Sequence, residues 1–267
     1  MAGTITGIKN IAFPSIDYAP SAARPRILWM DNARVISCFF VLLLHTSAGV
    51  VTGVADTGSV NWWLGNLMDS MSRWSMPVFV MMSGALLLDT SKNEPLSLFY
   101  KHRASRILTP LIFWTIFYVL FTYFGKLAVY GEQVTVMALI NSVLYGLPYY
   151  HLWYLYMIAG LYFFTPFLLR VIRQSEGNDL MVLCAALFVF SIAGNLFMAY
   201  FFGRQVPAIF TFIYYLPYFL AGYLIARVKN SPPLWLLWGV FIVSGALNSI
   251  GYYISFDPGR AAYNYFC

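Results

Sequence analysis

Charge is scarce in this chain: only 10% of its 267 residues are Asp, Glu, Lys or Arg, against about 25% in soluble domains. Hydrophobic residues make up 60%, aromatic residues 19%, and the mean hydropathy is +0.69. Too few polar side chains remain to cover a water-soluble globule. The composition excludes an ordinary soluble enzyme, a disordered chain and a nucleic-acid module, and it indicates a multi-pass membrane protein.

Cysteine is also rare, and the motifs of several enzyme classes are missing. Cys38, Cys184 and Cys267 show no pairing pattern, and the first two lie in apolar runs where a thiol packs as a small hydrophobe. The sequence has no Walker phosphate loop, no GxGxxG fingerprint, no GxSxG and no HExxH. We therefore expect no disulfide, no metal site, no ATP hydrolysis and no nicotinamide chemistry.

Seven apolar runs are close to the roughly 20 residues that a helix needs to cross a bilayer. The second run opens with polar residues, and the segment 126–150 between the third and fourth runs reads as a loop with a short surface helix. The pattern predicts an all-α, polytopic transmembrane helix bundle of about seven spans. The expected spans are 27–51, 62–88, 104–125, 151–170, 180–202, 207–228 and 233–254.

The distribution of Lys and Arg predicts the orientation. With a cytoplasmic N-terminus, 12 of the 16 basic residues fall on the inner side, as the positive-inside rule requires. Residues 1–26 lack the features of a removable signal peptide and are expected to be a cytoplasmic N-terminal segment. The membrane domain is predicted over 27–254, and 255–267 is predicted to be the outer-side end of the chain.

Two ionisable residues share one face of the first run. Arg34 and His45 are eleven residues apart, so on a helix they lie within about 20° of each other and about 16 Å apart along the axis. Ionisable groups inside a span are costly and usually face a cavity or a partner. Arg34 is either a snorkelling anchor or a functional group. His45 is either a structural hydrogen-bonding residue or a catalytic one.

The outer side carries further polar candidates. Asp69 and Arg73 are spaced i,i+4 and reach a depth similar to that of His45. They form either a purely structural pair or a pair that orients a substrate hydroxyl. His151 opens the fourth run among Tyr and Trp residues, on the same side as His45. It is either part of an interfacial belt or a group that faces the substrate.

A cationic stretch precedes the third run, in what we expect to be an inner loop. Lys101, Arg103 and Arg106 lie within six residues, and the two arginines, at i,i+3, are spaced to clamp one polyphosphate. The alternative is an ordinary loop that follows the positive-inside rule.

Taken together, these motifs resemble the acyltransferase-3 family of integral membrane O-acyltransferases, and within it the enterobacterial enzymes that acetylate the common antigen. The resemblance covers roughly residues 26–226. It departs from the family at Val35, where Gly is usual, and at Ala85, where an aromatic residue is usual. The matching segments are Asp31-Asn32-x-Arg34 with the spacing to His45, Ser75 to Gly84, Tyr100 to Arg106 with Pro110, His151 to Tyr154 with Tyr162 and Pro166, and Tyr218 to Tyr223.

The resemblance implies a donor, an acceptor and a location. The donor is acetyl-CoA as a co-substrate, with no permanently bound cofactor. The acceptor is a hydroxyl of a cell-envelope glycan or lipid-linked sugar, and the partners are therefore these two substrates and membrane lipids. The location is the bacterial inner membrane. Family members have about ten spans, so the resemblance also implies a C-terminally truncated ten-span bundle.

The resemblance also assigns roles to the candidate residues. Arg34 and His45 match the essential pair, and Arg103 and Arg106, with Lys101 beside them, match the arginines that contact CoA. The acceptor is then expected near Asp69, Arg73 and His151. His45 acts either as a general base or through an acetyl-histidine intermediate. Two rival functions are a transporter or flippase with an intramembrane His/Arg/Asp path and a seven-helix receptor or structural bundle.

Overall fold

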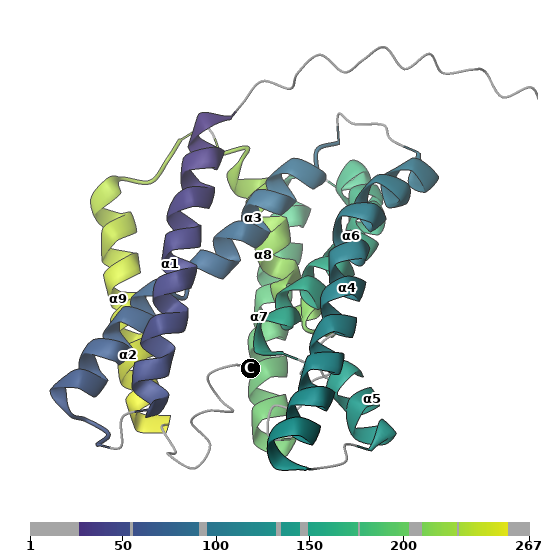
Figure 1. Ribbon diagram of the computed structural model, residues 1–267. Helices are drawn as coiled ribbons and strands as arrows, with labels where there is room; N and C mark the ends of the chain where they lie inside the picture. The colour runs from purple at the N-terminus through teal and green to yellow at the C-terminus, as the bar shows by residue number, and fades with distance from the viewer. Residues whose placement is uncertain are drawn as a thin grey trace, which may run out of the picture.

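The fold was analysed in a computed structural model, which describes residues 27–53, 56–90, 95–131, 135–144, 149–175, 177–202, 210–228 and 230–255. All regular structure in these ranges is helical. Five of the described helices are long and apolar enough to cross a membrane, which makes this a multi-pass membrane protein. They are α1 (Leu28–Gly53), α4 (Leu96–Tyr130), α6 (Trp153–Gln174), α7 (Gly177–Phe202) and α9 (Leu234–Ser255) (Figure 1).

Two of the seven expected runs are shorter than a full span. The run 62–88 divides into α2 (Val60–Ser72) and α3 (Ser75–Leu87). Pro77 explains the break, because it has no N–H to donate to the Arg73 carbonyl and its ring crowds that carbonyl. Within the expected run 207–228, α8 covers only Phe212–Ile225. The predicted short helix in the loop is present as α5 (Val136–Leu144), which buries no side chain.

The cationic stretch is helical, and the expected inner loop is wrong in this respect. α4 begins at Leu96, directly after Pro95, and continues through Tyr100–Arg106 and past Pro110 to Tyr130. Gly131, with φ of 66°, ends it in the left-handed conformation that glycine adopts without strain. Arg103 and Arg106 therefore project from a rigid helix. The first turns of α1 and α4 lie at the same end of the bundle, at the top of Figure 1.

α3 joins the two halves of the bundle (Figure 1). It packs against α1 on one side and α8 on the other, while α2 packs against α1 and α9. α8 also packs against α6 and α7, and α6 packs against α4. A short 3-10 turn, η1 (Tyr150–Leu152), leads into α6. The buried core lies around α8 and includes Val80, Met157, Leu161, Phe219 and Leu220.

Two glycines set the distance between α3 and α8. A Cβ at Gly84 would overlap the Phe219 carbonyl oxygen, and a Cβ at Gly222 would overlap the Met81 carbonyl oxygen. The two backbones therefore touch through reciprocal glycine contacts. Small residues at helix crossings are the usual means of close packing in membranes, where lipid tails compete for apolar surfaces. This contact fixes α3, and with it Ser83, against the core.

Candidate active site

The face of α1 that carries Arg34 and His45 forms as the spacing predicts. α1 is a continuous helix from Leu28 to Gly53, so the two side chains share a face about 16 Å apart. Arg34 Nη1 donates to Asp31 Oδ1 over 2.7 Å in a half-exposed ion pair. His45 is half-buried. Both side chains on this face are therefore partly accessible.

α6 presents matching groups to both ends of this α1 face. The charge of Arg34 acts on the Tyr162 hydroxyl, and His45 and His151 act on each other electrostatically. Along α1 the residue numbers rise from 34 to 45, whereas along α6 they fall from 162 to 151. Both steps are eleven residues, so α1 and α6 run antiparallel with two facing levels about 16 Å apart. We call the level of Arg34 and Tyr162 the arginine level, and the level of His45 and His151 the histidine level.

Three arginines converge on Tyr162 at the arginine level. The Ser83 side chain of α3 and the charges of Arg34, Arg103 and Arg106 all act on the Tyr162 hydroxyl. The structure thus brings together cations from α1 and α4 that sequence spacing alone placed on separate segments. A cationic level of this kind suits an anionic or strongly polarised ligand group.

Lys101 does not join this group. It is exposed and lies two residues before Arg103, which places it about 200° around α4. Arg103 is half-buried, and its guanidinium lies 5.2 Å from the centre of the Phe99 ring. This cation–π contact orients Arg103 toward the bundle. The predicted donor role of Lys101 stays a prediction, with less geometric support than that of the two arginines.

At the histidine level, His151 lies in an aromatic setting just outside the membrane-spanning part of α6. Its ring centre is 5.2 Å from that of Tyr118 and 4.9 Å from that of Tyr149. Burial lowers the pKa of His151 below its ordinary value of 6.5, and the nearby His45 lowers it further. The neutral imidazole is therefore the favoured form at neutral pH.

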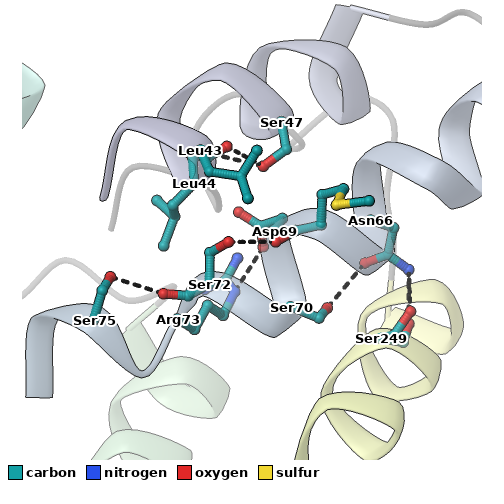
Figure 2. Close-up of polar contacts among 11 residues, drawn as sticks. Leu43, Leu44, Ser47, Asn66, Asp69, Ser70, Ser72, Arg73, Ser75 and Ser249 are labelled. Carbon is teal, nitrogen blue, oxygen red and sulfur yellow. Dashed lines mark hydrogen bonds and ion pairs between the residues drawn. The ribbon is translucent and has the colours of Figure 1, made fainter. Parts of the chain in front are cut away.

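Asp69 and Arg73 form an ion pair anchored in a polar face of α2 (Figure 2). Arg73 Nε donates to Asp69 Oδ2 over 2.7 Å; the Asp69 side chain is 1% exposed and that of Arg73 is 39% exposed. Nearby, Asn66 Nδ2 donates to the Ser249 carbonyl and hydroxyl of α9 at 2.9 and 3.0 Å. This network ties α2 to α9 one helical turn before Asp69.

The charge of Arg73 reaches the neighbourhood of the histidine level. It acts on the half-buried Tyr215 of α8, whose ring centre is 5.6 Å from that of Trp153. Trp153 follows His151 by two residues. The structure therefore places Arg73 toward the N-terminal end of α6, near His151.

Sequence reasoning missed some members of the site. Ser83 was noted only as part of a motif, although its side chain, from α3, acts on the Tyr162 hydroxyl at the arginine level. Arg170 and Arg173 were counted only for orientation, yet they line a pocket with Arg103. Their i,i+3 spacing, the same as that of Arg103 and Arg106, was the available signal. Among the described residues, no cluster of three or more His, Cys, Asp or Glu side chains could hold a metal ion.

Comparison with known proteins places the chain in a family. Residues 27–267 match the family model for the acyltransferase domain of the acyltransferase-3 type. No curated protein matches the chain, and no solved structure matches it. The finer likeness to the enterobacterial common-antigen enzymes therefore rests on the sequence motifs alone.

Proposed function

This chain belongs to the acyltransferase-3 family, and from that premise we propose that it moves an acetyl group from cytosolic acetyl-CoA to a hydroxyl of a cell-envelope glycan or lipid-linked sugar. The observation that carries the proposal is the pair of facing levels on α1 and α6. Cations gather at one level and two histidines at the other, as a donor with an anionic end and a reactive end requires.

The arginine level is the donor side. Arg103 and Arg106 bind phosphate oxygens of acetyl-CoA, since guanidinium groups bind phosphates through paired, charge-assisted hydrogen bonds. Arg34, on the facing helix, guides the pantetheine arm toward His45. The distribution of basic residues supports a cytoplasmic side for these arginines, where acetyl-CoA is made, and a cytoplasmic N-terminus. The membrane is then the bacterial inner membrane.

The histidine level is the reaction side. Neutral His45 takes the proton of the acceptor hydroxyl as the oxygen attacks the thioester carbonyl. The bond between the carbonyl carbon and sulfur breaks, the sulfur leaves as the CoA thiolate, and the proton from His45 neutralises it. The products are the O-acetylated acceptor and CoA. His151, held neutral beside His45, hydrogen-bonds the acceptor or the developing oxyanion.

The Asp69–Arg73 pair is the acceptor side. Asp69 fixes the guanidinium of Arg73, and the exposed part of Arg73 donates to hydroxyl or carboxylate oxygens of a sugar. The acceptor then approaches from the outer side, opposite to the donor. The two substrates need not pass each other.

The proposal is tested by acetyl transfer in membranes that contain the full chain. Acetyl-labelled acetyl-CoA is supplied with envelope glycans of the host, and the label in glycan or glycolipid is measured for wild type and for His45→Ala at equal protein level. The matched control is Thr46→Ala, which removes a neighbouring hydroxyl that bonds only to the backbone of its own helix. We expect label with wild type and Thr46→Ala and none with His45→Ala.

Two outcomes contradict parts of the proposal. Unchanged label in His45→Ala would remove the general-base role of His45. Movement of unmodified glycolipid across the membrane, without acetyl transfer and without acetyl-CoA binding, would favour the transporter or flippase.

A further inference from the structure

A cationic pocket lies beside the arginine level, at the C-terminal end of α6. Its volume is about 180 Å³. It lies among α4, α6 and the segment that follows α3. Asp89, Phe99, Arg103, Leu169, Arg170 and Arg173 are among the residues that line it.

The pocket carries an excess of positive charge. Arg103 comes from α4, and Arg170 and Arg173 come from α6, so basic residues of two helices line one space. Among the described residues of the lining, the one carboxylate is that of Asp89, which also lies 3.9 Å from Arg227 at the end of α8. Asp89 is therefore shared among several cations, and the net charge of the pocket favours an anion.

The rest of the lining and the size narrow the class of ligand. Leu169 and the buried Phe99 supply an apolar wall next to the arginines. Sites that enclose a whole small-molecule ligand usually measure about 300–1,000 Å³, so this pocket fits only one end of a large ligand. An anionic group attached to a flat apolar group fits both the charge and the apolar wall, and a nucleotide phosphate has this chemistry.

We infer that this pocket binds a phosphate group at the adenosine end of the acyl donor, with Arg170 and Arg173 contacting it together with Arg103. The inference rests on the proposed function and assigns two residues to donor binding that neither the sequence motifs nor the family match assigned. Arg103 lines the pocket and also acts on Tyr162. It thus connects the phosphate pocket to the arginine level, along which the pantetheine arm extends toward His45.

A phosphate of an anionic lipid headgroup has the same chemistry, so the experiment must separate the two sources. The full chain is reconstituted in nanodiscs of neutral phosphatidylcholine or with added phosphatidylglycerol. CoA binding is measured for wild type and for the double variant Arg170→Gln/Arg173→Gln. Lys126→Gln is the control, because Lys126 is an exposed cation at the other end of α4. Turnover is measured with acetyl-CoA and with acetyl-pantetheine, which lacks the nucleotide phosphates.

We expect the Kd for CoA to rise about tenfold or more in the double variant, since charge-assisted hydrogen bonds to phosphate are lost. Lys126→Gln should bind CoA as wild type does, in both kinds of nanodisc. Turnover of acetyl-pantetheine should be equal in wild type and the double variant, which also shows that the variant is folded.

Three results would overturn the inference. Equal CoA affinity in wild type and the double variant would do so. If, in that case, phosphatidylglycerol co-purifies with wild type but not with the double variant, the pocket binds lipid. An equal loss of turnover with both donors would give Arg170 and Arg173 a structural role only. If wild type binds no CoA, both the proposed donor and this pocket's role are wrong. If wild type transfers acetyl groups and the double variant binds CoA equally well, only the pocket's role is wrong.

Discussion

Replacing Gly84 with alanine tests the contact between α3 and α8 on which the site depends. The new methyl group would overlap the Phe219 carbonyl oxygen. A carbonyl of a helix backbone cannot rotate away as a side chain does, so the helices must separate. Overpacking a well-packed core costs about 1–3 kcal/mol, and we expect the upper part of that range. The gain in helix propensity from Gly to Ala offsets about 1 kcal/mol, which leaves a net loss of about 2 kcal/mol.

The control is Gly125→Ala in α4, where an added Cβ meets no atom within 4 Å. There only the propensity gain remains, so stability should stay equal or rise by up to about 1 kcal/mol. The assay is reversible unfolding of the purified protein in mixed micelles, followed by tryptophan fluorescence. A free energy of unfolding for Gly84→Ala equal to that of Gly125→Ala would refute the close contact of α3 and α8.

Two further predictions concern the histidine level and the α2 network. Replacing His45 with Gln should raise the pKa of His151 toward 6.5 without reaching it, because the effect of His45 disappears while the larger effect of burial stays. An NMR titration of labelled imidazole carbons measures this, and an unchanged pKa would mean that the two residues do not face each other. Asp69→Asn should lower stability by about 1–3 kcal/mol, because it leaves the half-buried Arg73 without its carboxylate. Unfolding of wild type and Asp69→Asn at two salt concentrations tests this, and equal stability would show that water already satisfies Arg73.

Hydropathy predicted where apolar segments lie better than where helices begin and end. The run 62–88 opens with polar residues and is apolar in its second half, and backbone hydrogen bonding at Pro77 divides it into α2 and α3. The stretch Tyr100–Arg106 is too polar for a span, so it was expected to be a loop. No helix breaker lies between Pro95 and Pro110, and the helix extends through the polar stretch into water. Hydropathy indicates whether a segment lies in lipid or in water. Where a helix begins and ends depends instead on backbone hydrogen bonding and on residues such as proline that interrupt it.

Periodicity predicted one face of the site, and only tertiary structure provides the other. The shared face of Arg34 and His45 follows from a spacing of eleven residues within one helix. Nothing in the sequence says that Tyr162 faces Arg34, because that pairing depends on how α6 packs against α8 and α8 against α3. Arg170 and Arg173 were predictable as inner-side cations but not as pocket residues, since the other wall of the pocket comes from α4.

The spacing along α6 explains why the donor should be an extended molecule. Arg173, Tyr162 and His151 follow one another at intervals of eleven residues, so they lie close to one face and span about 33 Å. That is close to the thickness of the hydrocarbon core, about 30 Å. A donor whose phosphate stays near Arg173 must carry its acetyl group past Tyr162 and onward to His45. A compact acyl donor cannot occupy both ends of this path, whereas a nucleotide joined to its thioester by a long flexible arm can. The distance between the cationic and histidine ends of α6 therefore suits an extended donor such as the proposed acetyl-CoA.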